Sequence, residues 1–203
     1  MFIRVRKSRL AIPAEEAVQR TREQIVPMLR KQPGFRGYYG VIIGGGEEAV
    51  TVTLYDDAST AARANDAVRE TVGGQKWISG DSEVLHGRVV FGANTEAMPS
   101  GDAFVVLRAF SGVTGEIAGR AAMLRETLLP VIVRAPGFIA HYGFANDRAA
   151  GQVVAVSVFD TEEHAMRSHE QALATIDRHE KLKEAMPNPP QVTAGQVAVL
   201  GKP

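Results

Sequence analysis

The sequence contains no cysteine, a single tryptophan and no excess of charge of either sign. The absence of cysteine excludes disulfides, thiolate metal sites and a thiol nucleophile. Lysine plus arginine and aspartate plus glutamate both total 23, so nucleic acid is not an expected partner. No stretch approaches the ~20 consecutive apolar residues of a membrane-spanning helix. We therefore expect a globular protein that binds neither nucleic acid nor membrane.

The opening residues alternate charged and apolar side chains. Arg4 and Arg6 stand where a secretory signal peptide needs a continuous apolar stretch, so we expect a cytoplasmic protein. Together with Lys7 and Arg9 they form a basic cluster on a predicted strand. Such a cluster can attract an anionic ligand, or it can discourage the addition of a further strand at a sheet edge.

One motif occurs twice. Pro33–Phe35, followed by Tyr39–Gly40, recurs 103 residues later as Pro136–Phe138, followed by Tyr142–Gly143. A shared period of this length predicts two copies of one domain. The copies are assigned to residues 1–92 and 103–203, with a linker rich in turn-forming residues at 93–102.

Each copy predicts the order strand, helix, strand, strand, helix, strand. In the first copy, alternation over residues 2–10 indicates a strand, and apolar residues at helical spacing over 14–29 indicate a helix. The last strands of the copies are expected at 84–91 and 196–200. Pro27 and Pro130 fall inside the first helix of each copy, where the missing backbone donor predicts a bend or break.

Apolar side chains occupy both odd and even positions of the strands, as over residues 153–156. In a sheet with one face in water, apolar and polar side chains should alternate along each strand. Both faces must therefore be covered. The fold class we expect is α+β: tandem ferredoxin-like repeats (β-α-β-β-α-β twice) whose antiparallel sheets pair into an α+β barrel. The chain would then be an intrachain pseudo-dimer, with a further homodimer left open.

The repeated motif, the apolar hairpins and the segments Asp160–Ala165 and Pro187–Val197 resemble the antibiotic-biosynthesis-monooxygenase-like domains of the dimeric α+β barrel superfamily. The resemblance covers nearly the whole chain. It implies ferredoxin-like units that pair through their sheets, with a pocket between the helices and the sheet. Members include cofactor-free oxygenases of aromatic polyketides, haem-degrading oxygenases and proteins with no demonstrated activity.

Two polar residues, Asn65 and His169, interrupt the inward apolar row of the second helix of each copy at equivalent positions. An amide can hold an enolate oxygen and an imidazole can remove a proton from an activated carbon, as a cofactor-independent monooxygenase requires. We predict catalytic roles for both, no cofactor, and a small hydrophobic, aromatic or polyketide-like substrate. The alternative is a non-catalytic ligand-binding or stress-related module, in which both side chains only bind a neighbouring carbonyl.

Four further residues are candidates for substrate binding: Trp77, Tyr39, Tyr142 and His141. Trp77 either caps the first pocket or covers a sheet edge. The two tyrosines share the parity of the phenylalanine that opens their strand, which favours core packing with a satisfied hydroxyl. His141 has the opposite parity.

A haem alternative rests on His169 and His179, whose spacing of ten residues resembles the Trp-then-His spacing of haem-degrading members. An imidazole is a sound axial iron ligand. The competing interpretation is that the charged run 177–181 is a solvated helix face. His164, His169 and His179 do not share a helix face, so no metal site is expected.

Overall fold

The computed structural model describes residues 1–72, 75–95, 103–115 and 117–203. These residues form two compact units, which are described separately below. Unit 1 comprises Met1–Arg88 and Val197–Pro203, and unit 2 comprises Val89–Gln196. Most of the predicted linker, residues 96–102, lies outside the described residues, and the predicted domain boundaries stay a prediction.

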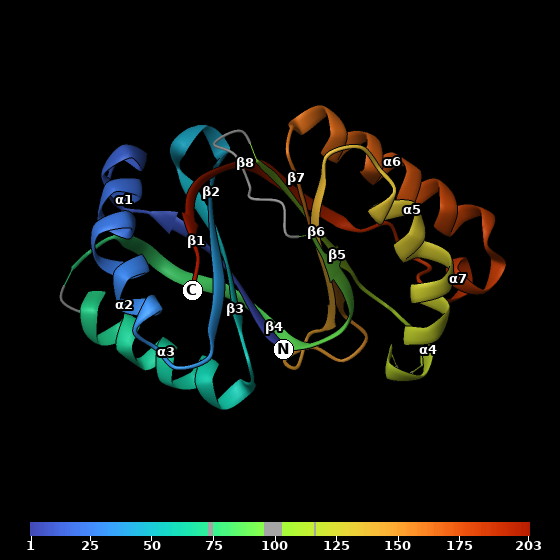
Figure 1. Ribbon diagram of the computed structural model, residues 1–203, viewed down its shortest axis with the longest axis horizontal. Coiled ribbons are helices and arrows are strands. Elements are labelled where there is room, and N and C mark those ends of the chain that lie inside the picture. The colour runs from blue at the N-terminus through green and yellow to red at the C-terminus, as the bar shows by residue number, and fades with distance from the viewer. Residues whose placement is uncertain (73–74, 96–102, 116) are drawn as a thin grey trace. The chain divides into compact units, whose positions relative to one another are not determined.

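Unit 1 is an antiparallel sheet with helices packed against one face (Figure 1). Its strand order is β4-β1-β3-β2-β8. The strands are β1 (Phe2–Leu10), β2 (Phe35–Ile43), β3 (Glu48–Tyr55), the first part of β4 (Ile78–Asn94) and the end of β8 (Gln191–Gly201). The helical segments are α1 (Ala14–Arg20), a π-helical turn η1 (Thr21–Ile25), α2 (Val26–Arg30), a 3₁₀ turn η2 (Gly44–Gly46) and α3 (Ala58–Val72).

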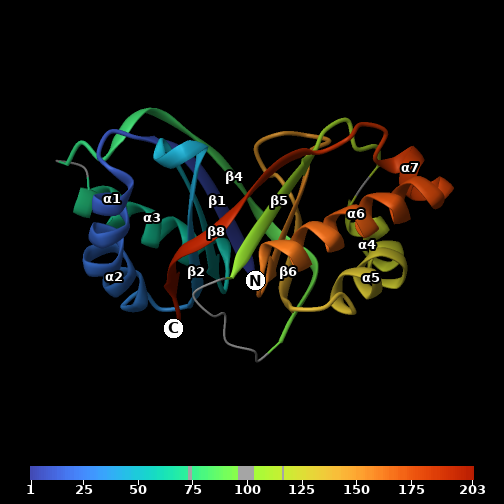
Figure 2. The same ribbon diagram turned by 90° about the horizontal axis from the view of Figure 1, so that it is seen from above.

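Unit 2 has the same order of elements, and its helices likewise pack on one face of its sheet (Figure 2). Its strand order is β8-β5-β7-β6-β4. Besides parts of β4 and β8, its strands are β5 (Phe104–Phe110), β6 (Phe138–Ala145) and β7 (Val153–Phe159). The helical segments are α4 (Ile117–Met123), a π-helical turn η3 (Leu124–Leu128), α5 (Leu129–Val133), α6 (Glu162–Arg178) and α7 (Glu180–Ala185).

The strands β4 and β8 each pair in both units. Over the described residues the hydrogen-bonded order is therefore closed, as β1-β3-β2-β8-β5-β7-β6-β4, which is the order of a closed antiparallel barrel. The fold class is α+β, as predicted. Every residue of β7 is buried, so this strand does not have a wet face. That each copy covers the sheet of the other stays a prediction.

Both β4 and β8 are longer than predicted. They begin at Ile78 and Gln191, well before the predicted starts at residues 84 and 196. Gly80, with φ +70°, and the polar residues after it have low strand propensity, which conceals this part of β4 in the sequence. Tertiary pairing overrides that propensity, because Ile78 pairs with Leu10 across the sheet.

The two helix-interior prolines follow π-helical turns. In each unit one such turn ends directly before the short helix that carries Pro27 or Pro130 at its first positions. The backbone is right-handed helical on both sides of each boundary, so the chain continues through the proline, and the missing amide donor falls beside the π-helical turn. The predicted break is therefore a local change of helical register.

Candidate functional site: a cavity in unit 1

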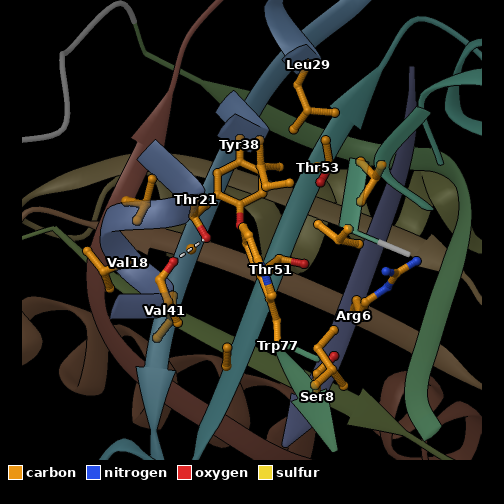
Figure 3. Close-up of a pocket in the computed structure, with 18 of the residues that line it drawn as sticks. Arg6, Ser8, Val18, Thr21, Leu29, Tyr38, Val41, Thr51, Thr53 and Trp77 are labelled. Carbon is orange, nitrogen blue, oxygen red and sulfur yellow. Dashed lines mark hydrogen bonds between the residues drawn. The ribbon is translucent and has the colours of Figure 1, made fainter. Parts of the chain in front are cut away.

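A cavity of about 270 Å³ lies between the helices and the sheet of unit 1 (Figure 3). Pockets for drug-sized ligands span roughly 300–1,000 Å³, so this cavity suits a molecule at or below the lower end of that range. Apolar side chains from α1, η1, α2, α3 and the sheet make up most of its wall: Val18, Ile25, Leu29, Val41, Val68, Val72 and Val199.

Two arginines of β1 line the cavity, two residues apart and so on the same face of the strand. Arg6 Nη2 donates to Asn65 Oδ1 of α3 at 2.8 Å, and Arg4 Nη1 donates to the carbonyl oxygen of Ala61 at 3.0 Å. Burial lowers the pKa of Arg6, because the charged guanidinium loses hydration. The side chain of Asn65 thus lies in the cavity wall and holds the Arg6 guanidinium.

Hydroxyl groups supply the other polar part of the cavity wall. Four of them belong to Tyr38, Thr51, Thr53 and Tyr55 of β2 and β3, and Figure 3 shows the first three projecting into the cavity. Burial raises the pKa of both Tyr38 and Tyr55, so these phenols stay protonated at neutral pH. The described residues that line this cavity include no carboxylate and no histidine.

Trp77 lines the cavity from the segment that precedes β4 and is nearly buried. Its Nε1 donates to Oε1 of Gln75 at 2.6 Å, and the guanidinium carbon of Arg20 lies 5.5 Å from its ring centroid. The ring is thereby fixed at the wall. Because Trp77 is the only tryptophan of the chain, its fluorescence reports on this cavity alone.

The two tyrosines predicted to bind substrate are buried, but on the other face of the sheet. A β-bulge between Phe35 and Gly37 shifts the register of β2, so that Tyr38 shares the face of Phe35 and Tyr39 does not. The bulge at Phe138 in β6 does the same for Tyr142. The predicted parity of both tyrosines is therefore wrong, and Tyr39 is not among the residues that line the cavity.

In unit 2 a buried polar network replaces an open cavity. Arg108 of β5 is 2% exposed, and its Nε donates to Nδ1 of His169 at 2.8 Å. Its Nη1 donates to Oγ of Ser157 at 2.9 Å, and that hydroxyl lies 2.8 Å from Nδ1 of His141. Burial lowers the pKa of Arg108 to about 10. Nη2 of Arg108 and Nε2 of His141 have no hydrogen-bond partner among the described residues.

The hydrogen bond from Arg108 decides which nitrogen of His169 carries the proton. Because Nδ1 accepts from the guanidinium, a neutral His169 ring is protonated at Nε2 and keeps no lone pair for a substrate proton. Burial, followed by the charge of Arg108, lowers the pKa of His169. The predicted role of His169 as a base requires this hydrogen bond to break. Asn65 belongs to unit 1 and His169 to unit 2.

The strand registers show that the two units carry polar groups at corresponding positions. In unit 1 Phe2 pairs with Tyr55, and in unit 2 Phe104 pairs with Phe159. These equivalent pairs align β1 of unit 1 with β5 of unit 2. The corresponding pairs are Arg6 and Arg108, Tyr38 and His141, Thr53 and Ser157, and Asn65 and His169. An arginine bound to a side chain of the second helix is thus common to both units.

Larger side chains fill the corresponding space of unit 2. Phe110 of β5 corresponds to Ser8 of β1. Phe91 corresponds to Val199, because Phe91 pairs with Gly143 in unit 2 and Val199 pairs with Gly40 in unit 1. The ring of Phe91 lies so close over Gly143 that an added Cβ would come within 2.2 Å of it. The cavity of about 30 Å³ that remains there is too small for an organic ligand.

The haem alternative does not fit the described residues of unit 2. His179 ends α6 and precedes α7, and its Nδ1 is buried without a hydrogen-bond partner. A cavity of about 30 Å³ beside the helices cannot hold a macrocycle. Among the described residues no cluster of histidine and carboxylate side chains could hold a metal ion, and no helix is long and apolar enough to cross a membrane.

Arg6, Tyr38 and Arg108 are not among the site residues predicted from the sequence. Arg6 is hidden in the basic cluster of β1, where the sheet-edge interpretation competes with ligand binding. Arg108 carried a usable signal, since it is the one charged residue in the otherwise apolar strand β5. A lone arginine in a buried strand needs polar partners, and these proved to be His169 and Ser157.

No protein-family model and no curated protein matches this chain. Solved structures do. A "Putative monooxygenase" from Fusobacterium nucleatum has a TM-score of 0.78 at 13% identity, over 99% of this chain and 94% of that chain. An anthrone oxidase-like protein has a TM-score of 0.63 at 15% identity, over 99% and 92%. The chain has the dimeric α+β barrel fold.

The same α+β barrel fold also occurs in proteins that act on haem. The heme-degrading enzyme of Listeria monocytogenes has a TM-score of 0.55 at 9% identity and covers 97% of this chain and 98% of its own. At such identities the likeness concerns the fold and not the chemistry. The activity of this α+β barrel therefore has to be argued from its own cavity.

Proposed function

We propose that this protein binds a small, mainly apolar molecule, aromatic or polyketide-like, in the cavity of unit 1. The observation that carries this proposal is the cavity itself, an apolar wall with the Arg6–Asn65 pair as its polar anchor. Apolar walls with a few placed polar groups are typical of small-molecule sites. The volume favours a ligand of one to three fused rings.

Filling the cavity is expected to abolish binding. Val68 of α3 lines the cavity and makes no polar contact that the Val68→Phe substitution would remove. Aromatic probes such as 2-naphthalenemethanol should change the fluorescence of Trp77 in the wild type. In Val68→Phe the probe affinity should fall at least tenfold, because the larger ring occupies the space of the ligand.

The matched control is Val192→Phe on β8, where the side chain is 43% exposed and lies in unit 2. This variant should keep the wild-type affinity and the wild-type unfolding midpoint. Equal affinity in Val68→Phe and the wild type would place the ligand elsewhere and contradict the proposal.

A second candidate function is a cofactor-independent monooxygenase acting in the same cavity. It is supported by the fold that the chain shares with an anthrone oxidase-like protein and by donors that could hold an oxyanion. In this mechanism a substrate CH₂ group beside a carbonyl loses one proton. The acceptor is water or hydroxide, because the described residues that line the cavity include no carboxylate or histidine to act as the base. The carbanion then reduces dioxygen; one oxygen atom becomes the new carbonyl and the other leaves as water.

Removal of Asn65 tests the oxygenase. In this mechanism Asn65 and Arg6 stabilise the enolate oxygen, and loss of one such donor costs roughly 10²–10³-fold in rate. We therefore expect Asn65→Ala to lower the kcat/KM for dioxygen uptake with an anthrone about 100-fold. The substitution Asp66→Ala, at the exposed neighbouring position of α3, should leave it unchanged. Probe binding without any dioxygen uptake in the wild type would indicate a non-catalytic binding module instead.

A further inference from the structure

The charge of the cavity in unit 1 is not balanced by the described residues that line it. Two guanidinium groups, those of Arg4 and Arg6, face the cavity, and no carboxylate does. The hydrogen-bond partner that Arg6 finds is the neutral amide of Asn65. Among the described residues of unit 1, the ion pairs of Lys7 with Glu48 and of Arg36 with Asp56 leave Arg6 without a carboxylate partner. The cavity therefore carries a positive charge in a mainly apolar wall.

The phenols beside Arg6 do not supply the missing negative charge. The charges that act on Arg6 belong to Arg69, which is cationic, and to the phenols of Tyr55 and Tyr38, whose pKa values are both raised by burial. The two phenols remain neutral at physiological pH. A guanidinium in such surroundings has lost much of its hydration without gaining a counter-ion, and an anion placed against it recovers that cost through charge-assisted hydrogen bonds.

Unit 2 shows what the same arginine does when no ligand can reach it. Arg108 donates to His169 and Ser157 and is buried, and the larger side chains Phe91 and Phe110 lie in the core of this unit. In unit 1 the corresponding positions hold Val199 and Ser8, and the space beside Arg6 is open. The arginine is thus common to both units, and only in unit 1 is its charge accessible from a cavity.

We propose that the ligand of unit 1 is an anion, an aromatic molecule whose ionised oxygen group, such as a carboxylate, binds the guanidinium of Arg6 while its rings lie on the apolar wall beside Trp77. This inference rests on the proposed binding function and names the chemical class of the ligand. Arg4 lies one strand period away on the same face and adds to the positive potential.

The test compares two probes of nearly equal shape, 2-naphthoate and 2-naphthalenemethanol, by titration of Trp77 fluorescence at pH 7. The wild type should bind the carboxylate at least tenfold more tightly than the alcohol. In Arg6→Gln the affinity for the carboxylate should fall at least tenfold, and the affinity for the alcohol should change less than threefold. Arg6→Lys keeps the charge and should retain most of the preference for the carboxylate.

The control is Arg9→Gln, which removes the same charge from an exposed position of β1 and should leave both affinities unchanged. Equal binding of the two probes by the wild type overturns the anion inference and leaves the binding function standing. Binding of neither probe overturns both. The wild-type comparison holds even if Arg6→Gln fails to fold, and unfolding midpoints of all variants are measured alongside.

Discussion

Lowering the pH from 7 to 4 is expected to reduce the free energy of unfolding by about 3 kcal/mol through His141 alone. Burial, and then the charge of Arg108, lower the pKa of His141 from the ordinary histidine value of 6.5 to about 3. Between these values the unfolded chain binds a proton at this position and the folded chain does not. Unfolding therefore takes up a proton, so this contribution is complete above about pH 6.5 and is lost as the pH falls toward 3.

The surroundings of His141 give its charged form no favourable partner. The ring is completely buried, it lies against Ser157 and Phe91, and the charge that acts on it is the guanidinium of Arg108. His169, on the other side of Arg108, has its pKa lowered by the same two causes, although Glu170 opposes the shift. Its contribution has the same sign, so both histidines destabilise unit 2 in acid.

The variant His141→Gln isolates the effect, because an amide can bind the Ser157 hydroxyl but does not titrate in this range. Urea unfolding at pH 7 and pH 4 should show that the wild type loses about 3 kcal/mol more than the variant between the two pH values. An equal loss in the two proteins would mean that His141 is protonated in the folded state. Hydrogen bonds from Thr60 and Ser59 lower the pKa of Asp57 to about 2. Its titration changes the stability of the wild type and of the variant equally, so it does not contribute to the difference between them.

The second large effect is expected for Gly137→Ala in the repeated Pro-Gly-Phe motif. Gly137 has φ +69°, and a Cβ there would lie 1.8 Å from Oδ1 of Asp160 and 2.5 Å from Nδ1 of His164. The left-handed backbone costs an alanine about 1–2 kcal/mol, and the overlap forces apart the Asp160–His164 contact of 2.7 Å. We expect a total loss of about 3 kcal/mol in the free energy of unfolding.

The repeat offers matched controls for this prediction. Gly34 occupies the same place in unit 1 with φ +79°, but its added Cβ would meet Oδ2 of Asp56 only at 3.0 Å. Gly45 has φ +67° and nothing within 4 Å. Urea unfolding should rank the losses as Gly137→Ala above Gly34→Ala above Gly45→Ala, the last at about 1 kcal/mol. Equal losses at all three positions would show that steric overlap contributes nothing.

The element order of both units could be predicted from the sequence, because hydrophobic periodicity and turn residues act locally. The strand ends of β4 and β8 could not. Residues 78–83 contain glycine and polar side chains, and they are strand because β1 offers them hydrogen-bond partners. The faces of Tyr39 and Tyr142 were misassigned because one bulge residue reverses all later side chains of a strand.

The candidate site was only partly visible in the sequence. Asn65 could be identified because a polar residue interrupts an apolar helical row. Its partner Arg6 is 59 positions away on another element, and no spacing rule connects them. The tautomer that Arg108 imposes on His169 is likewise a consequence of a contact between distant residues, and it changes the chemistry that the imidazole can perform.

The sequence by itself determined the α+β class, the order of elements and the recurrence of Pro-Gly-Phe, because these depend on local backbone preferences and on the alternation of apolar residues. The tertiary structure decided which of two similar units keeps a cavity. That outcome depends on Phe91 and Phe110, which line the small space left in unit 2, whereas Val199 and Ser8 line the larger cavity beside Arg6 in unit 1. The volume left between helices and sheet depends on side chains from several strands at once, so it can be known only from the tertiary structure.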